Sequence, residues 1–222
     1  MLRIRDDDIL VPSSSWSNPF ERFKEIHEWI VPHQGRVVHV PTILVAELQM
    51  FPECIAYIKE NVANGTMEPQ IHGFHHIDYS RLRLPKDRVP DRGAVDLRLF
   101  NLEELNVHFR AVQQHIATSK EWISNHFGAP DTWYTPWGAD NPLLRKVAES
   151  LKLKLVGVDK KSFLQHVGAE LRDGKTTVDE IKDRELFIHW WDRGRRVLRM
   201  CLAVEYGSWA EAEKARPDAF KE

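Results

Sequence analysis

Short apolar runs alternate along the chain with longer segments in which apolar residues recur at helical spacing. This alternation is typical of βαβ units and predicts a largely parallel sheet with helices on its faces. We expect strands at residues 2–4 and 36–40, ending near residues 71 and 134, and at residues 153–158 and 185–191. We expect helices at residues 19–30, 52–62, 102–127 and 142–151.

Capping residues mark the starts of three of these helices. Asn18 precedes a proline, as Asn141 does, so each places a capping side chain before a residue suited to the first helical turn. Asn101 and Glu104 have the spacing of a capping box, and one apolar face continues from there to Gly128. These signals predict helices that begin at residues 19, 102 and 142.

Length and composition are those of one α/β domain. The chain has 222 residues and no long Pro-, Gly- or Ser-rich linker, which predicts a single domain over residues 1–222. The formal net charge of −2 argues against nucleic-acid binding, which needs a strongly basic face. Cys54 and Cys201 are too few for a disulfide framework and form no CxxC zinc motif.

The N-terminus and the hydropathy indicate a cytoplasmic protein. The chain opens Met-Leu-Arg-Ile-Arg-Asp-Asp-Asp, without the apolar segment of a signal peptide or the character of a transit peptide. No apolar run approaches the ~20 residues that a membrane-spanning helix needs. We therefore expect a cytoplasmic enzyme without a transmembrane segment, while the oligomeric state is not set by the pattern.

Three consecutive aspartates, residues 6–8, directly follow the first predicted strand. Neighbouring carboxylates repel one another, so such a cluster is costly unless a cation or cationic side chains balance it. Parallel α/β folds place their functional groups at the carboxyl ends of strands. The cluster therefore indicates a cation or an active site, with a solvated acidic turn as the alternative.

Three histidines fall within five positions, His-Gly-Phe-His-His at residues 72–76, where another strand ends. His72 and His76 share one face if the segment turns helically. Imidazole binds zinc and related divalent ions, and two histidines with one carboxylate leave positions open for water and substrate. The spacing favours a metal site, with a histidine-rich surface loop as the alternative.

Two further strand ends carry aromatic residues. Residues 133–138 read Trp-Tyr-Thr-Pro-Trp-Gly, which suits either the wall of a sugar-binding groove or simple packing at the end of the sheet. Residues 186–192 contain His189 near the end of an apolar strand, with Asp192 close by. Such a histidine serves as an acid or base when a carboxylate tunes it, and otherwise is a hydrogen-bonded core residue.

Taken in order, these four clusters resemble the polysaccharide deacetylase family (carbohydrate esterase family 4, the NodB-homology domain) over residues 2–192. The specific features are the HxxxH spacing and the chain order of all four blocks. The resemblance implies a distorted (β/α) barrel with seven or so parallel strands and an active site at their C-terminal ends. It also implies metal-dependent hydrolysis of the N-acetyl or O-acetyl group of a sugar.

The family's first motif, Thr-Phe-Asp-Asp-Gly, is similar to residues 4–8, Ile-Arg-Asp-Asp-Asp. This match implies that Asp6 is the general base and that Asp7 is a metal ligand. A slip of one position shifts the two roles to Asp7 and Asp8. The two registers therefore stay open.

The second motif, His-Ser/Thr-x-x-His, matches His72 and His76, which the resemblance makes the other two metal ligands. Gly73 stands where the family has a hydroxyl residue, and His75 is the expected bystander. The cofactor implied is one divalent metal ion. Zinc is the default, and cobalt, nickel or iron also suit two histidines and an aspartate.

The third motif, Arg-Pro-Pro-Tyr-Gly, aligns with residues 134–138. The resemblance implies that the backbone N–H of Trp137 holds the tetrahedral oxyanion, and that Tyr134 and Pro136 line the substrate site. Tyr134 replaces the family's arginine, which usually orients the base aspartate, and Arg5 or Arg3 is a candidate to substitute for it.

The fifth motif, Leu-x-His, is similar to residues 187–189. His189 is then the general acid, and Phe187 forms part of the acetyl pocket. Asp159, after the strand expected to end at residue 158, corresponds to the family's groove-wall aspartate. The departures from the motifs leave two interpretations, a deacetylase with a divergent substrate or a catalytically weakened member that binds metal and carbohydrate.

Residues 79–98 form an irregular, Arg- and Pro-rich excursion that follows the histidine cluster. It is either a solvated basic loop or a receiver for an anionic substrate, such as a nucleotide- or lipid-diphosphate-linked sugar or an acidic glycan. A cytoplasmic location favours an intermediate of surface-polysaccharide synthesis (lipopolysaccharide or capsule). The expected partner is therefore an acetylated sugar or glycan.

Overall fold

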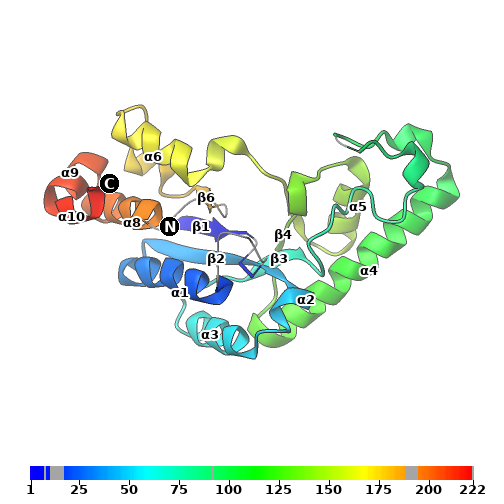
Figure 1. Ribbon diagram of the computed structural model, residues 1–222, viewed down its shortest axis with the longest axis horizontal. Coiled ribbons are helices and arrows are strands. Elements are labelled where there is room, and N and C mark those ends of the chain that lie inside the picture. Colours follow the sequence, from blue (N-terminus) through cyan, green and yellow to red (C-terminus); the bar gives the residue numbers. More distant parts are fainter. Residues whose placement is uncertain (8, 11–17, 92, 189–194, 222) are drawn as a thin grey trace. The chain divides into compact units, whose positions relative to one another are not determined.

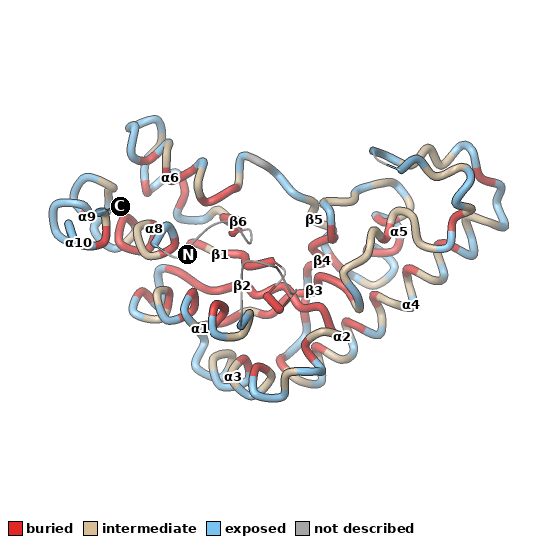
Figure 2. The backbone as a smooth tube through the Cα atoms, viewed as in Figure 1, coloured by how far each residue is buried: buried red, intermediate tan, exposed pale blue. Residues whose placement is uncertain are grey.

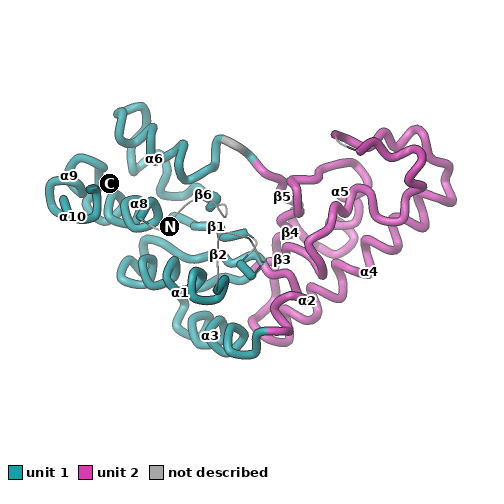
Figure 3. The backbone as a smooth tube through the Cα atoms, viewed as in Figure 1, with its two compact units in different colours: residues 1–42, 51–69, 159–222 teal, residues 43–50, 70–158 magenta. Residues whose placement is uncertain are grey.

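The computed structural model describes residues 1–7, 9–10, 18–91, 93–188 and 195–221 (Figure 1). The chain divides into two compact units (Figure 3). Unit 1 comprises residues 1–42, 51–69 and 159–222, and unit 2 comprises residues 43–50 and 70–158. Because the chain enters each unit more than once, neither is a simple N- or C-terminal half. A single domain over residues 1–222 stays a prediction.

Unit 1 contains a parallel sheet with the strand order β2-β1-β6. The strands are β1 (Leu2–Asp6), β2 (Val37–Leu44) and β6 (Glu185–Ile188), and β2 runs on into unit 2 at residue 43. Ile4 lies opposite His39 on one side and Leu186 on the other. β2 continues past residue 40, where the sequence predicted its end.

Helices cover one face of this sheet. Leu2 and Ile4 lie in a buried cluster with residues of α1, α6 and α8, such as Ile26, Val167 and Met200. Figure 2 shows buried backbone along β1 and β2. The helices of unit 1 are α1 (Pro19–Ile30), η1 (Val31–His33), α3 (Pro52–Ala63), η5 (Lys160–Ser162), α6 (Leu164–Arg172), α7 (Val178–Ile181), α8 (Arg195–Tyr206), α9 (Trp209–Ala215) and α10 (Pro217–Phe220).

Unit 2 contains a second run of parallel strands, in the order β3-β4-β5. They are β3 (Gln70–Gly73), β4 (Thr132–Tyr134) and β5 (Lys154–Val156). Trp133 lies opposite Ile71 on one side and Leu155 on the other. Trp133 is fully buried, as expected for the middle of a strand between two neighbours.

The long helix α4 (Leu102–Phe127) lies against β3 in unit 2. Asn101 and Glu104 form the capping box that their spacing predicts, since each side chain accepts a hydrogen bond from the other residue's backbone N–H. The remaining helices of unit 2 are α2 (Val45–Leu48), η2 (Lys86–Arg88), η3 (Leu97–Leu99), η4 (Pro136–Gly138) and α5 (Pro142–Ser150).

The predicted α/β class is confirmed, because parallel strands alternate with helices as in a distorted (β/α) barrel. The structure has six strands among its described residues, against the seven or so expected. The helix starts at residues 19, 102 and 142 are confirmed as well. No described helix has the length and apolar character that crossing a membrane requires.

Candidate active site

Alternation along β1 separates the first two aspartates. Side chains two residues apart share one face of a strand, so Asp6 lies on the face of Leu2 and Ile4, toward α1. Its carboxylate is fully buried, 3.6 Å from Arg22 Nη1 and 3.7 Å from His39 Nε2. Neither carboxylate oxygen has a hydrogen-bond partner within the described part of the chain.

His39 continues this polar region toward α1. His27 Nδ1 lies 3.2 Å from His39 Nδ1, and His27 Nε2 lies 3.3 Å from the Thr66 hydroxyl. Burial, with a smaller contribution from the charge of His39, lowers the pKa of His27 to about 4. His27 is therefore neutral at physiological pH, and the surroundings of Asp6 are a buried structural network.

Asp7 lies on the opposite face and is firmly held. Arg5 donates two hydrogen bonds to it, from Nε to Oδ1 at 2.9 Å and from Nη2 to Oδ2 at 2.8 Å. The Thr42 hydroxyl donates a third bond to Oδ1 at 2.9 Å. A bidentate, charge-assisted pair fixes the orientation of a carboxylate. Asp7 is therefore held in one orientation by Arg5 and Thr42.

Arg5 also links Asp7 to β6. Its guanidinium carbon lies 4.4 Å from the centroid of the Phe187 ring, and its Nη1 lies 3.7 Å from Glu185. Phe187 is buried and pairs with Arg5 across the two strands. The structure thus brings together Arg5, Asp7 and the residue that the sequence assigns to the acetyl pocket.

In unit 2, β3 leads directly into the histidine cluster. His72 Nδ1 lies 2.8 Å from the Tyr134 carbonyl oxygen, which only accepts hydrogen bonds. Nδ1 therefore carries the proton, and Nε2 carries the lone pair that a metal ligand needs. The rings of His72 and His76 have centroids 5.4 Å apart. The two imidazoles lie together as their spacing predicts.

Gly73 makes room for a tyrosine beneath the histidine turn. A Cβ at this position would lie 2.7 Å from the hydroxyl of Tyr79, which is too close. That hydroxyl accepts hydrogen bonds from the N–H groups of Phe74 and His75 and donates one to the His75 carbonyl. Burial raises the pKa of Tyr79 to about 12, so it stays a neutral donor. The bonds hold the turn that separates His72 from His76.

The aromatic loop places one indole in the open. Trp137 has a left-handed backbone (φ 61°) and is 72% exposed, with its ring 5.1 Å from that of His76. Pro136 is buried, as is Tyr134, whose carbonyl orients His72. A cavity of about 670 Å³ adjoins the indole. Its polar walls include Asp78, Arg81, Asp91, Asp140 and Asn141.

Of the other predicted site residues, Asp159 lies on the surface and the rest fall outside the described residues. Asp159 is exposed, and its carboxylate accepts a hydrogen bond from the N–H of Lys161. Asp8, His189 and Asp192 fall outside the described residues. The sequence did not predict that Thr42 contacts Asp7. The only sequence signal for Thr42 is its place near the end of β2.

The donor set of unit 2 fits a divalent metal in its chemistry. His72 has the required tautomer, and a carbonyl orients its ring as is usual for metal-bound histidine. Among the described residues, no group of three or more His, Cys, Asp or Glu side chains forms a complete metal site. His72 and His76 thus lie close together in unit 2, and their role as metal ligands stays a prediction.

The comparisons with known proteins concern structure alone. No protein-family model matches the chain, and no curated protein matches it either. BA3943, described as a family 4 carbohydrate esterase (CE4) pseudoenzyme from Bacillus anthracis, matches with a TM-score of 0.55 at 11% identity, over 92% of this chain and 60% of BA3943. The chain has the family 4 carbohydrate esterase fold.

Two further solved structures are similar to the chain. A BA3943 mutant, described as having restored enzymatic activity, matches with a TM-score of 0.55 at 11% identity, over 92% of this chain and 62% of the mutant. A family 4 carbohydrate esterase from Streptomyces lividans, in complex with acetate, is 14% identical over 98% of this chain and 88% of the esterase, with a TM-score of 0.48. The chain thus spans about three fifths of BA3943.

Proposed function

We propose that this protein is a metal-dependent carbohydrate deacetylase that hydrolyses the N-acetyl, or O-acetyl, group of a sugar. The observation that carries the proposal is the Asp7 carboxylate, which Arg5 and Thr42 hold on the face of β1 opposite Asp6. The fold supports the proposal, as does the tautomer of His72.

Of the two registers for the acidic cluster, we propose the one with Asp7 as general base and Asp8 as metal ligand. Arg5 orients Asp7 and so takes over the task of the arginine that Tyr134 replaces. The other register, with Asp6 as base and Asp7 as ligand, has less support. It requires a base on the helix-covered face of β1, near Arg22.

In the proposed reaction, Asp7 accepts a proton from the attacking water while the water oxygen forms a bond to the carbonyl carbon. The N–H of Trp137 donates to the oxyanion, a type of contact worth ~3 kcal/mol. His189 protonates the nitrogen as the carbon–nitrogen bond breaks, which releases acetate and a free amine. His72, His76 and Asp8 would hold a divalent ion, which would lower the pKa of a bound water toward ~7 and polarise the carbonyl.

The cavity beside Trp137 is the proposed place for the sugar. An exposed indole offers a flat apolar surface to a sugar ring, and Asp78, Asp91 and Asn141 offer polar groups for its hydroxyls. Asp159 is a less suitable wall, since its carboxylate caps a local turn.

An anionic substrate receives less support from residues 79–98 than their composition suggests. Arg81 binds Asp78 and two backbone carbonyls, Arg88 binds Glu104, and Arg98 binds Asp96. Among the described basic residues, the prediction of a nucleotide- or lipid-linked or acidic sugar therefore depends on Arg83 and Lys86, both of which are exposed, while Arg92 falls outside the described residues. A role in surface-polysaccharide synthesis, at a cytoplasmic site, remains a prediction that rests on this substrate class.

The alternative is a member of the fold that binds metal and carbohydrate with weakened catalysis. Tyr134 in place of the arginine favours it, because its buried side chain supplies no guanidinium. The Arg5–Asp7 pair favours the active enzyme instead. An experiment with both metal and acetate readouts separates the two.

The test is metal content and acetate release, measured on wild type, His76→Gln and His75→Gln after incubation with zinc, cobalt, nickel or iron(II). Substrates are N-acetylated and O-acetylated sugars and short glycans. We expect about one equivalent of metal and acetate release in wild type. Both should be lost in His76→Gln and kept in His75→Gln, which alters the exposed neighbour in the same turn. Metal binding without acetate release would favour the weakened member, and absence of both would overturn the proposal.

A further inference from the structure

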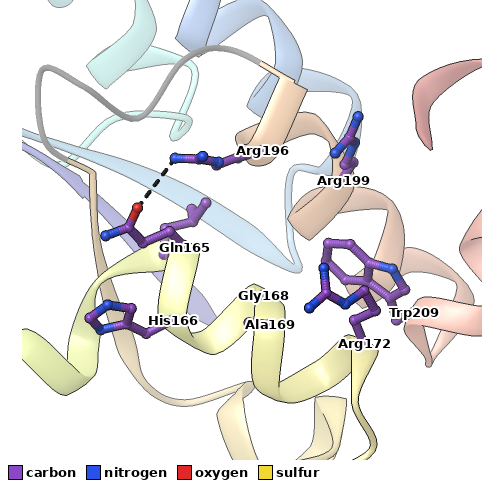
Figure 4. A pocket seen from close by; sticks show the side chains of 9 residues that line it. Gln165, His166, Gly168, Ala169, Arg172, Arg196, Arg199 and Trp209 are labelled. Carbon is purple, nitrogen blue, oxygen red and sulfur yellow. Dashed lines mark hydrogen bonds between the residues drawn. The ribbon is translucent and has the colours of Figure 1, made fainter. Parts of the chain in front are cut away.

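A second cavity, of about 390 Å³, lies within unit 1 between α6, α8 and α9 (Figure 4). Leu164 of α6 and Met200 of α8 belong to the buried cluster that covers the Leu2 and Ile4 face of β1. Arg5 and Asp7 lie on the other face of that strand. The cavity is therefore separate from the residues of the proposed active site in unit 1.

The walls of this cavity are strongly basic. Arg172 comes from α6, while Arg196 and Arg199 come from α8, and His166 adds an imidazole. None of the described residues that line it is acidic. Three guanidinium groups around one hollow create a positive potential that favours an anion, and their planar forks suit phosphate oxygens. The charge of the walls thus specifies an anionic ligand.

Arg199 is held in place by neutral partners. Its Nε donates to the Ala219 carbonyl at 2.9 Å, and its Nη2 donates to the Lys221 carbonyl at 3.1 Å. The guanidinium also lies 5.8 Å from the centroid of the Phe220 ring. Carbonyl partners orient the group but do not neutralise it. Arg199 therefore lines the cavity with a guanidinium that is held in place and keeps its positive charge.

The two other arginines differ in how they are held. Arg196 Nη1 donates to the Gln165 amide oxygen at 3.4 Å, the bond drawn as a dashed line in Figure 4. Arg172 pairs with Asp173 at 3.1 Å, but both side chains are substantially exposed and Asp173 also pairs with Lys175. Surface pairs of this kind contribute little and exchange readily. Arg172 is thus available to turn toward a ligand.

Trp209 gives the cavity a flat apolar wall. Its indole lies against the backbone of α6, where a Cβ on Gly168 would be 3.6 Å from the ring. On another side it meets the Phe220 ring edge-on, with centroids 5.1 Å apart. Ser208 caps α9 by accepting a hydrogen bond from the Glu211 N–H, which fixes the start of the helix that carries Trp209. The indole is thus a rigid surface for a ring.

We propose that this cavity binds a phosphorylated ring compound, of the class of a nucleotide or a sugar phosphate. The arginines receive the phosphate, and Trp209 contacts the ring. A volume of about 390 Å³ lies within the usual range of small-molecule sites. This site does not depend on the deacetylase proposal, because it uses none of the same residues.

The test is calorimetric titration of the intact protein with UDP, glucose 1-phosphate and inorganic phosphate at low ionic strength. We expect UDP or glucose 1-phosphate to bind more tightly than phosphate. Arg199→Gln should weaken binding about tenfold or more, as expected for a charge-assisted contact. Arg195→Gln is the matched control, because Arg195 lies on the same helix and also binds the Lys221 carbonyl, but does not line the cavity. It should change affinity less than about twofold.

Two further variants keep the result interpretable. Arg172→Gln tests the same positive field from α6, without the contacts that tie Arg199 to the C-terminal residues. Trp209→Leu should weaken UDP or glucose 1-phosphate but leave inorganic phosphate unchanged. Equal losses of affinity in the Arg195, Arg172 and Arg199 variants would mean that binding depends only on the overall charge of the protein, which would overturn the proposal. So would the absence of binding by wild type, or equal affinity for all three probes.

Discussion

Asp6 and Asp7 are neighbours in the chain and equally buried, yet they have opposite surroundings. Asp6 lies among helix-facing groups, near Arg22 and His39, with no hydrogen bond to either oxygen in the described structure. Asp7 accepts three bonds, two from Arg5 and one from Thr42. The alternation of the strand therefore gives two identical neighbouring residues different surroundings, and we propose that Asp7 alone is the catalytic carboxylate.

Among the groups that hold Asp7, removing the Arg5 guanidinium should have the largest effect on activity. Arg5→Gln should lower kcat for acetate release about 100-fold, because the Asp7 base loses its orientation. KM should change little, because the substrate-binding residues stay in place. Arg5→Lys should recover only part of the rate, since an ammonium lacks the bidentate fork.

Arg3→Gln is the matched control for this prediction. Arg3 lies on the same face of β1, in partly exposed ion pairs with Glu68 and Glu185. Pairs of this kind contribute little, so kcat should stay within about twofold of wild type. Similar losses in the Arg3 and Arg5 variants would contradict a specific role for Arg5.

On the other face, Asp6→Asn should act on stability. Removing one member of a buried charge pair typically costs about 3 kcal/mol, because the partner charge stays buried. Asp7→Asn should cost less, since Arg5 keeps Glu185 within 3.7 Å. Urea unfolding of the two variants measures the difference. If Asp7→Asn is the more destabilised variant, Asp7 contributes more to stability than Asp6, which contradicts a mainly structural role for Asp6.

The polar network behind Asp6 should also respond to pH. His27 has a pKa of about 4 in the folded protein and 6.5 when exposed. Between these two values, the unfolded chain binds a proton at His27 and the folded chain does not. Its contribution to stability is complete above pH 6.5 and is lost as the pH falls toward 4, by up to about 3 kcal/mol.

Comparison with His27→Gln isolates this contribution. Burial lowers the pKa of His33, His108 and His115 too, so these residues add to the wild-type slope in the same direction. Unfolding free energies measured from pH 7 to pH 4 should fall less steeply in His27→Gln. Identical slopes would mean that His27 is protonated in the folded protein.

The smallest effect is expected at Thr42. Thr42→Val removes one hydrogen bond to Asp7 and leaves both bonds from Arg5 in place. The unfolding free energy should fall by about 1 kcal/mol and kcat by a few-fold. Steady-state kinetics and urea unfolding measure the two. A loss of rate as large as that of Arg5→Gln would show that Thr42, and not Arg5, orients the carboxylate.

Local signals in the sequence predicted much of the fold. The helix starts depend on caps such as Asn18, Asn101 and Asn141, which act within one turn of their own position. The pairing of His72 with His76 is likewise a matter of spacing four residues apart. Such features need no knowledge of the rest of the chain.

The register of the acidic cluster could not be predicted in the same way. It depends on which face of β1 the helices cover, and that is decided by residues such as Val167 and Met200, far away in the sequence. Thr42 bonds to Asp7 in unit 1, and Tyr79 bonds to the histidine turn in unit 2. No motif marks either residue. The arginines of residues 79–98 suggested an open basic surface, but Arg88 and Glu104 neutralise each other across 16 positions.

The most direct test of Asp7 as the catalytic base is to measure acetate release by Asp6→Asn and Asp7→Asn. Each variant is loaded with metal and compared with wild type. If Asp7 is the base on the reactive face of β1, Asp7→Asn should lose about 1,000-fold in kcat, while folded Asp6→Asn should stay within about tenfold of wild type. A loss of that size in Asp6→Asn, with Asp7→Asn still active, would contradict the division of the two aspartates between structure and chemistry.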